Sequence, residues 1–560
     1  PRAPRALVAD AHTIYVVGEL SNAIGTYATT TSSTVSLVRG ADVVVTDAVG
    51  LRGIALTESG FAVVDIDGVL RTVDKKGATT SALAIGPGAL GVMHVGPWLV
   101  SMSVLGHRIV AVPLDEHDRI DSARAVHVDN AGPFWGFDAR LQGNALWLAA
   151  GHAEDHALDR RGGSFGYIDS FVRIVDIEGG AARTVAEINT SEKGVVVPKA
   201  LAFVDDRTVL ALGAGSGAGV QIDIDTFATE EVKALPGISA VALAGNHVLA
   251  ASPLLDAWVV LEGAPRAVPV PGATPRSVAS KLGEALVFTT IMAPRQKSDA
   301  ELSRFTCETC HFEGGGDGRI HDTGRGEVGQ PPITATTKPL FGLFNNKPLF
   351  TRALDENLTV MAHAEFRVAN ANSSLDPWFA LTPVDAPWLS LLGVTGTVAP
   401  IEMRRALVTF LHDFTPRTNA RALTPHFSLA EQRGAEVFRD RCASCHAARL
   451  IGDDAGTAQP FASWEKFILS DNSPLTWSTV PRVKTGIEPY VHEEGARPTS
   501  LRRIDRKRPY FTNGSSTTLD DVVSRARFDD STFLHSSKRT DLRALSPDDQ
   551  RSLVSFLRLL

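Results

Sequence analysis

Short apolar runs rich in β-branched and aromatic residues recur along the first 295 residues, separated by segments that contain glycine, aspartate and asparagine. Most of these runs begin about 36 to 50 residues apart, and helical periodicity is nearly absent between them. Runs of this length and composition predict β-strands joined by turns. The seven runs are TIYVVG at 13, FAVVDI at 61, WLVSMSV at 98, ALWLAAG at 145, TVLALGAG at 208, HVLAAS at 247 and ALVFTT at 285.

This recurrence predicts that residues 1–295 form an all-β propeller. Each interval has room for four short strands, and each such blade would bury its faces against its neighbours. Seven runs predict seven blades. The longer interval from 145 to 208 carries the polar stretch GHAEDHALDRRGGSFGYIDS, which we interpret as a long loop inserted within a blade. A pair of β-sandwiches is the alternative, because turn signals alone do not establish closure of the ring.

From about residue 296 the pattern changes to helices and loops. The stretch APIEMRRALVTFLHDF (399–414) has apolar residues at helical spacing, which predicts a helix that closes a domain over residues 296–418. The stretch TPRTNARALTP then reads as a linker, and a second domain follows over residues 425–560. We expect both domains to be mainly α-helical.

The second domain has clear signals for its first and last helices. Ser428 with Glu431 three residues later predicts a capping box, and the helix that it opens leads into Cys442. At the end of the chain, Ser546 is expected to cap a helix in which Pro547 takes the first position. A helix that leads into a cysteine motif and a terminal helix that packs across it are the usual pair of a cytochrome c module.

Composition narrows the class of protein. A chain of 560 residues with 44% hydrophobic residues can form several domains with substantial cores. The formal net charge of −8 and the lack of a polybasic tract argue against nucleic acid as a partner. No uncharged apolar run reaches the roughly 18 residues that a membrane-spanning helix needs, so we expect no membrane span.

All four cysteines of the chain belong to C-x-x-C-H sequences. Cys307, Cys310 and His311 form the first, and the second consists of the residues Cys442, Cys445 and His446. At this spacing two thiols can attach to a haem, and the next imidazole can bind its iron. A disulfide within each motif, a thioredoxin-like redox pair and a zinc site shared by the motifs are alternatives. None of them explains a histidine at the same place twice.

We therefore predict two covalently bound haem c groups, with iron bound by His311 and His446 as proximal ligands. Attachment of this kind implies assembly outside the cytoplasm, so we expect a periplasmic or secreted bacterial protein. The chain opens at PRAPRALVAD without a visible signal peptide, and we expect that one was removed from the sequence.

A longer segment between the second motif and the last helix carries a family resemblance. The segment GARPTSLRRIDRKRPYFTNGSSTTLDDVV (495–523) contains a P-[ST]-L-R-like turn, then P-Y-F-x-[DN]-G-S, then T-L-x-x-[VA]-V. Two cytochrome c modules with this segment resemble the bacterial dihaem cytochrome c peroxidases and their MauG-like relatives. The resemblance covers roughly residues 300–560. Some bacterial proteins fuse a similar propeller to such peroxidases.

The resemblance implies a division of labour between the two haems. The N-terminal haem, on His311, would react with hydrogen peroxide, and the C-terminal haem, on His446, would relay or store electrons. Family members use a glutamate as acid–base group after an inter-haem tryptophan. Glu365 is the candidate here, while Phe350 takes the tryptophan's place and puts fast transfer through that position in doubt. A calcium ion occurs between the modules in the family, but no acidic cluster locates it in this chain.

The composition limits which residues could bind the second iron in addition to His446. None of the five methionines lies in the C-terminal module, so a methionine ligand would have to come from another domain. Family ligands come from the segment before the last helix, and His535 occupies that segment. We therefore predict His535 as the second ligand, with His492 as the alternative.

These features predict peroxide cleavage at the first haem with oxidation of an electron-donor protein, an organic substrate or a partner protein. The propeller is the expected docking face for a protein partner. An electron-transfer protein with two six-coordinate irons and no catalytic activity is the main alternative. A propeller-based dehydrogenase is less favoured, because the propeller sequence shows no cofactor-anchoring signature.

Overall fold

The computed structural model describes residues 2–560 except 32–34, 156–167, 246, 293–305, 323–333, 351–352, 370–378, 385, 416–417, 452–457 and 480. The chain divides into two compact units. We call the first the propeller unit and the other the second unit. The propeller unit comprises Pro1–Ala157, Tyr167–Pro275 and Val287–Thr309; the second unit comprises Leu158–Gly166, Arg276–Leu286 and Cys310–Leu560.

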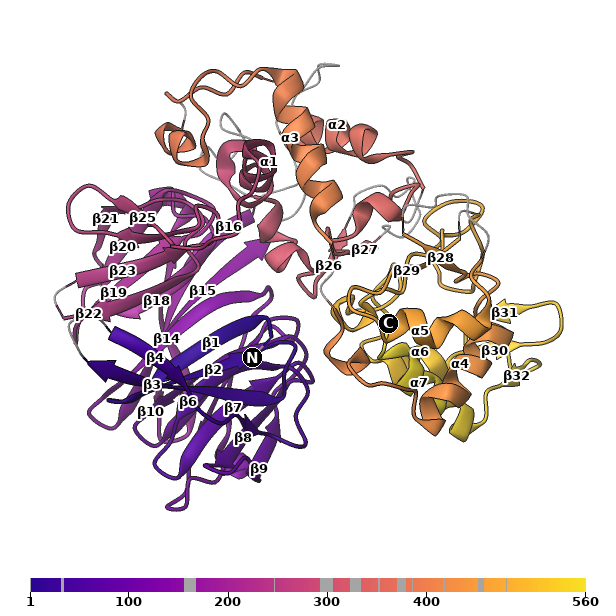
Figure 1. The fold of residues 1–560 in the computed structure, drawn as a ribbon, viewed down its shortest axis with the longest axis horizontal. Helices are drawn as coiled ribbons and strands as arrows, with labels where there is room; N and C mark the ends of the chain where they lie inside the picture. Colours follow the sequence, from indigo (N-terminus) through magenta and orange to yellow (C-terminus); the bar gives the residue numbers. More distant parts are fainter. Residues whose placement is uncertain are drawn as a thin grey trace. The chain divides into compact units, whose positions relative to one another are not determined.

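The propeller unit contains six antiparallel sheets, each a meander of four consecutive strands (Figure 1). In the first sheet a fifth strand, β5, also pairs with β3. The first three sheets are β1 (Pro4–Ala9), β2 (Thr13–Gly18), β3 (Ala23–Thr31), β4 (Val35–Arg39) and β5 (Val43–Val44); β6 (Leu51–Leu56), β7 (Gly60–Asp65), β8 (Val69–Asp74) and β9 (Thr79–Ala84); and β10 (Ala89–Val95), β11 (Trp98–Ser103), β12 (Arg108–Pro113) and β13 (Val126–Asp129). The other three are β14 (Phe134–Gln142), β15 (Ala145–Asp155), β16 (Ile168–Glu178) and β17 (Ala181–Asn189); β18 (Pro198–Phe203), β19 (Thr208–Gly213), β20 (Ala218–Asp223) and β21 (Thr229–Lys233); and β22 (Ala240–Ala244), β23 (His247–Ser252), β24 (Ala257–Val260) and β25 (Arg266–Pro269).

The sheets pack as propeller blades, because the first strand of each blade contacts the first strand of the next. The contacts run from β1 to β6, β10, β14, β18 and β22. The middle strands are buried on both faces, as the fully buried β7 shows. This explains why the apolar runs of the sequence fall on middle strands, whereas the outer strand of a blade, such as β9, alternates between half-buried and exposed residues. The N-terminal part of the chain is a β-propeller.

The prediction of seven blades is wrong, because the described residues form six. The seventh run, ALVFTT at 285, begins inside helix α1 (Val278–Phe288) instead of a strand. Leu282, Ala285 and Leu286 of that helix are buried. A short apolar run cannot be assigned to strand or helix by periodicity alone, and these buried positions follow helical spacing.

The two ends of the polar stretch at 151–170, which was predicted to be an inserted loop, belong to strands. Strands β15 and β16 are eleven residues each, and they pair from Leu146↔Ile177 to Asp155↔Ile168. The middle of the polar stretch, residues 156–167, lies outside the described residues. A loop between β15 and β16 therefore stays a prediction, and the strands reach further into the polar stretch than its composition suggests.

The second unit consists of helices, 3-10 turns and short ribbons. The predicted helices at 399–414, after Ser428 and after Ser546 are all confirmed, and the last part of the chain folds around α4 and α7 (Figure 1). The predicted boundary at residue 295 lies outside the described residues. The elements are α1, continuing into the propeller unit, α2 (Leu358–Ala369), α3 (Pro400–Asp413), α4 (Leu429–Arg441), α5 (Trp464–Ile468), α6 (Leu519–Ser524) and α7 (Pro547–Leu557), with ribbons β26 (Ile320–Asp322) and β27 (Thr334–Thr336), β28 (Ala448–Leu450) and β29 (Leu475–Trp477), and β30 (Arg527–Phe528), β31 (Phe533–Leu534) and β32 (Arg543–Ala544). No described helix has the length and apolar character needed to cross a membrane.

Two helix pairs in the second unit cross in the same way. A Cβ added to Gly283 of α1 would lie 2.1 Å from the Ala406 carbonyl oxygen and 2.6 Å from Phe410 Cβ of α3. A Cβ added to Gly434 of α4 would lie 2.0 Å from the carbonyl oxygen of Ser552 and 2.7 Å from Phe556 Cβ of α7. In each pair a glycine therefore lets two helices touch, and a phenylalanine one turn along packs beside the contact. Helix α1 is thus the counterpart of α4.

A second repeat links residues 342–358 to residues 503–519, at a constant offset of 161 positions. In both segments a residue with positive φ precedes a 3-10 turn, an isolated bridge closes a loop, and a helix follows. The matched features are Gly342 (φ 76°) and Arg503 (φ 55°), the bridges Leu349↔Asp355 and Tyr510↔Ser516, Phe350 (φ 62°) and Phe511 (φ 66°), and the helix starts Leu358 and Leu519. The second unit is therefore built from two related halves.

Candidate functional site

Helix α4 delivers the second C-x-x-C-H sequence. Its capping box is formed, because Ser428 Oγ accepts a hydrogen bond from Glu431 N and Glu431 Oε2 accepts one from Ser428 N. Cys442 follows the last residue of the helix, and its carbonyl oxygen accepts hydrogen bonds from the backbone N–H groups of Cys445 and His446. The motif is thus one tight turn, which brings both thiols and the imidazole to one place. None of the four cysteines, all of which lie in the described part of the chain, forms a disulfide, and each is half-buried.

His446 is oriented by a backbone carbonyl. Its Nδ1 lies 3.4 Å from the carbonyl oxygen of Trp477, at the end of β29. A carbonyl only accepts, so Nδ1 carries the proton and Nε2 keeps a free lone pair, the arrangement typical of a metal-binding histidine. Burial lowers the pKa of His446 to about 4, although hydrogen bonds to the backbone of Trp477 and Thr499 oppose the shift. The imidazole is therefore neutral at physiological pH, as a ligand must be.

His535 faces the same region. Burial and, to a lesser extent, the charge of His446 lower its pKa to about 3, so the two imidazoles lie close enough to interact. The His535 ring packs against Phe511 and Phe533, at centroid distances of 5.3 and 5.1 Å. Its Nδ1 is buried and has no hydrogen-bond partner among the described residues. A buried imidazole with an unsatisfied nitrogen is a candidate ligand.

His492, the alternative ligand, is used differently. Its Nδ1 accepts a hydrogen bond from the backbone N–H of Glu494, which leaves the ring in a local turn near the surface. The structure therefore brings His446 and His535 together and gives His492 a local role.

The first C-x-x-C-H sequence begins in a 3-10 turn over Cys307–Thr309. Cys307 Sγ lies 3.6 Å from Met292 Sδ. His311 Nδ1 lies 3.3 Å from the carbonyl oxygen of Gly315, so its Nε2 is also free to bind. Burial lowers the pKa of His311 to about 4, and the backbone of Lys338 opposes the shift. Lys338 corresponds to Thr499 in the repeat, so both proximal histidines have the same backbone neighbour.

A buried charged group orders the loop after His311. Asp317 is fully buried and accepts hydrogen bonds from Arg319 Nε at 2.8 Å and His321 Nε2 at 2.9 Å. Burial alone would raise the Asp317 pKa, but the charges of Arg319 and His321 outweigh it and hold the pKa well below its usual range. Arg319 Nη2 also lies 3.8 Å from Cys310 Sγ. These pairs hold the loop after His311 in place.

The predicted acid–base residue, Glu365, lies half-buried on α2, next to the buried Phe366. Its role stays a prediction. Phe350 is 45% exposed and corresponds in the repeat to Phe511, which contacts His535. Phe350 thus holds in the first half the place that Phe511 holds in the second, and its position between the two sites stays a prediction.

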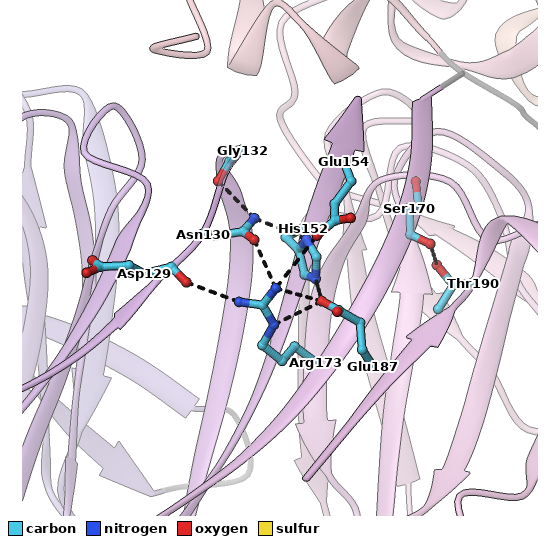
Figure 2. Close-up of polar contacts among 9 residues, drawn as sticks. All are labelled: Asp129, Asn130, Gly132, His152, Glu154, Ser170, Arg173, Glu187 and Thr190. Carbon is cyan, nitrogen blue, oxygen red and sulfur yellow. Dashed lines mark hydrogen bonds and ion pairs between the residues drawn. The ribbon is translucent and has the colours of Figure 1, made fainter. Parts of the chain in front are cut away.

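A polar cluster on the propeller is the main candidate outside these motifs (Figure 2). His152 on β15 is fully buried, and its Nε2 lies 2.7 Å from Glu187 Oε1 on β17. Arg173 on β16 donates two hydrogen bonds to the same carboxylate and one to Asn130 Oδ1. His152 foremost, and Arg173 with it, lower the Glu187 pKa to about 2 despite its partial burial.

This cluster acts as a structural cross-link. His152, Glu154 and Glu187 could together hold a metal ion by position, but the Arg173 guanidinium already binds the Glu187 carboxylate. A cation would compete with that guanidinium for the same oxygen. The cluster therefore ties strands β15, β16 and β17 to the end of β13 through Asn130.

Sequence reasoning missed one contact that involves the first motif. Lys199 on β18 binds Glu308, with Nζ 3.0 Å from Oε1, and both side chains are nearly buried. Glu308 is one of the two residues between Cys307 and Cys310. Only its position inside the motif could have drawn attention to it, since nothing in the sequence pairs it with a lysine more than 100 positions away.

No family model matches the chain, and no curated protein matches it. Among solved structures, virginiamycin B lyase from Staphylococcus aureus is similar at 12% identity and a TM-score of 0.33, over 48% of this chain and 85% of that one. BamB from Moraxella catarrhalis is similar at 14% identity and a TM-score of 0.29, over 46% and 73% of the two chains. Hydrazine synthase from Kuenenia stuttgartiensis is similar at 11% identity and a TM-score of 0.30, over 46% and 93%.

Proposed function

We propose that the protein is a dihaem c-type oxidoreductase of the cytochrome c peroxidase and MauG-like kind. The observation that carries the proposal is the repeated module. Each C-x-x-C-H sequence follows a helix whose glycine packs on a second helix beside a phenylalanine, and each motif ends in a histidine with Nδ1 held by a backbone carbonyl. A zinc site or redox dithiol would need none of this repeated architecture.

The residues present fit a haem in each module. Cys307 and Cys310 would attach the first haem and His311 would bind its iron; Cys442, Cys445 and His446 would do the same for the second. When bound, such a haem supplies an iron that can react with hydrogen peroxide or pass electrons. His535 would be the second ligand of the iron bound by His446, since its Nδ1 is buried and has no hydrogen-bond partner among the described residues. Calcium has no support, because the cavity between the two halves is lined by lysine and arginine.

In this proposal the first module cleaves peroxide. The Glu365 carboxylate takes the proton from the near oxygen of peroxide and returns it to the departing oxygen, which leaves as water. Two electrons and two protons then complete the reduction to a second water; the protons come from solvent, and a donor protein, an organic substrate or a residue of a partner protein supplies the electrons. The propeller is the proposed docking module, and cofactor attachment implies a location in the periplasm or outside the cell.

The test is a haem count with spectroscopy of the ferric protein. The pyridine haemochrome should report two haems per chain. His535→Gly should convert one low-spin component to high-spin, because it removes the outer ligand of the second iron. His492→Gly is the matched control and should leave the spectrum unchanged. A count of one haem, or a spectral change only with His492→Gly, would contradict the assignment.

A second measurement addresses peroxide turnover. Glu365→Gln keeps the size of the side chain but removes the proton acceptor, so turnover should fall by about a hundredfold or more while the spectra stay nearly unchanged. Glu356→Gln, at an exposed position just before α2, is the control. An inactive wild-type protein with two low-spin irons, in both the ferric and the half-reduced form, would favour the electron-transfer alternative.

A further inference from the structure

A cavity lies between the two related halves of the second unit, and equivalent segments of the repeat line it. Residues 338–346 contribute one wall and residues 499–507 contribute the other, and the two ranges are again 161 positions apart. The lining residues are Lys338, Pro339, Phe341, Gly342, Leu343, Asn346, Thr476, Thr499, Ser500, Arg502 and Lys507. The cavity therefore lies on the pseudo-symmetric junction of the two halves.

At two matched positions of the repeat, the second half has a cationic side chain where the first half has a neutral one. Phe341 corresponds to Arg502, and Asn346 corresponds to Lys507. Lys338 and Lys507 lie close enough for the charge of Lys338 to lower the pKa of Lys507. Asp505 partly offsets this charge, but its carboxylate already lies 3.5 Å from Arg503.

Arg497 adds a fourth cation behind the wall of the cavity. Its side chain is buried, with 2% of the residue exposed, and Nη1 donates a hydrogen bond to Asn346 Oδ1 at 3.2 Å. Its Nε and Nη2 are buried and have no acceptor among the described residues. A buried guanidinium with two unsatisfied donors is costly unless an anion accepts them.

Burial has lowered the pKa values of these groups. The pKa falls to about 8 for Lys338, about 7 for Lys507 and about 10 for Arg497 and Arg502, and loss of hydration is the main cause in each. The same groups would regain ordinary pKa values beside a negative charge. The geometry that favours an anion is the pair of unsatisfied Arg497 donors beside a cavity lined by Lys338, Arg502 and Lys507.

We propose that this cavity binds an oxyanion, specifically a carboxylate or a phosphate-like group, between Lys338, Lys507 and Arg502, with Arg497 supporting it. Two sources share this chemistry. One is a propionate of a haem held in either module, which rests on the proposed function; the other is a free anion from solution, which does not. The two wall segments also carry the backbone groups of Lys338 and Thr499 that contact His311 and His446, so a bound anion would lie behind both histidines.

The test uses the full-length protein as purified with its cofactors. Inorganic phosphate is titrated by calorimetry into the wild type, Lys507→Gln, Arg497→Gln and the exposed control Lys466→Gln. If the anion is free, the wild type and the control should bind phosphate, and the first two variants should bind about tenfold or more weakly, because each loses a charge-assisted hydrogen bond.

If the anion is a propionate, phosphate should not bind, because the site is already filled. The propionate bending band in the resonance Raman spectrum should then shift in Lys507→Gln and Arg497→Gln and stay in place in Lys466→Gln. Absence of both effects overturns the proposal. The haem count separates the two hypotheses: phosphate binding without haem would reject the proposed function alone, and two haems without either effect would reject the anion site alone.

Discussion

The contacts of a histidine ring in this protein, more than its residue type, determine which of its nitrogens could bind a metal. Four histidines, namely His152, His311, His446 and His535, are buried or half-buried, and their ring nitrogens make different contacts. In His311 and His446 a backbone carbonyl fixes Nδ1 and leaves Nε2 free, whereas His535 keeps an unsatisfied nitrogen among phenylalanine rings. In His152, by contrast, Nε2 contacts the Glu187 carboxylate. The C-x-x-C-H spacing was sufficient to identify two of these residues, but the partners of the others come from strands far away in sequence.

The Glu187 contact predicts a pH dependence of propeller stability. Because the folded pKa is about 2, below the usual value of 4.5, the contact stabilises the fold above about pH 4.5 and its contribution is lost as pH falls toward 2. Glu187→Gln should therefore lower the free energy of unfolding near neutral pH by about 1–2 kcal/mol, since solvent screens the partly exposed carboxylate.

Chemical denaturation from pH 7 to pH 3, followed by far-UV circular dichroism, measures this effect. The difference between wild type and Glu187→Gln should shrink as the pH falls. Glu178→Gln, at an exposed end of β16, should show no such trend. A constant difference across the range would mean that the cross-link acts through packing instead of charge.

At the scale of elements, helix crossings define the two halves of the second unit. Gly434 and Gly283 each sit where a Cβ would lie about 2 Å from a carbonyl oxygen of the facing helix. Real atoms do not approach so closely, so a side chain there must push the helices apart. The glycines therefore matter through close approach, since neither has a positive φ.

Gly434→Ala and Gly283→Ala should each destabilise the second unit by about 2–4 kcal/mol. Thermal unfolding followed in the haem absorption bands is the measurement. Gly396→Ala is the matched control, because no atom lies within 4 Å of the added Cβ. If Gly283→Ala matched the control, helix α1 would not be the counterpart of α4.

The contrast between α1 and α4 also explains what the sequence could reveal. Helix α4 carries a capping box and leads directly into Cys442, so both its start and its role were predictable. Helix α1 ends at Phe288, well before Cys307, and its apolar run resembles the blade strands in length and composition. Its identity depends on Ala406 and Phe410, which pack against Gly283 and lie more than 100 residues away. The six blades were predictable from local runs, whereas this helix was not.

At the scale of the whole molecule, the chain leaves the propeller unit, enters the second unit and returns before the first motif. Arg276–Leu286 belongs to the second unit, and Val287–Thr309 belongs to the propeller unit. Thr290 N donates a hydrogen bond to the carbonyl oxygen of Gly215, and the buried Lys199–Glu308 pair holds the end of the returning segment. The start of the first motif, up to Thr309, thus belongs to the propeller unit.

Lys199→Gln should destabilise the propeller unit by about 3 kcal/mol, because it leaves the Glu308 carboxylate buried without its cation. The double variant Lys199→Gln/Glu308→Gln should recover most of this loss. On the proposed function, the spectral component of a haem bound by His311 should change in the single variant, while that of a haem bound by His446 stays constant. Lys193→Gln, on an exposed turn, is the control, and equal losses in the single and double variants would contradict a direct pair.

The burial of this segment also sets an order of events in time. Thr306, Glu308 and Thr309 are nearly or completely inaccessible in the folded protein. An enzyme that joins a haem to Cys307 must bind the peptide around that residue. It cannot bind this peptide once Lys199 and Glu308 have formed their buried ion pair. On the proposed function, the first cofactor is therefore attached while Thr306, Glu308 and Thr309 are still accessible, and the packing of these residues in the propeller unit is a late step of maturation.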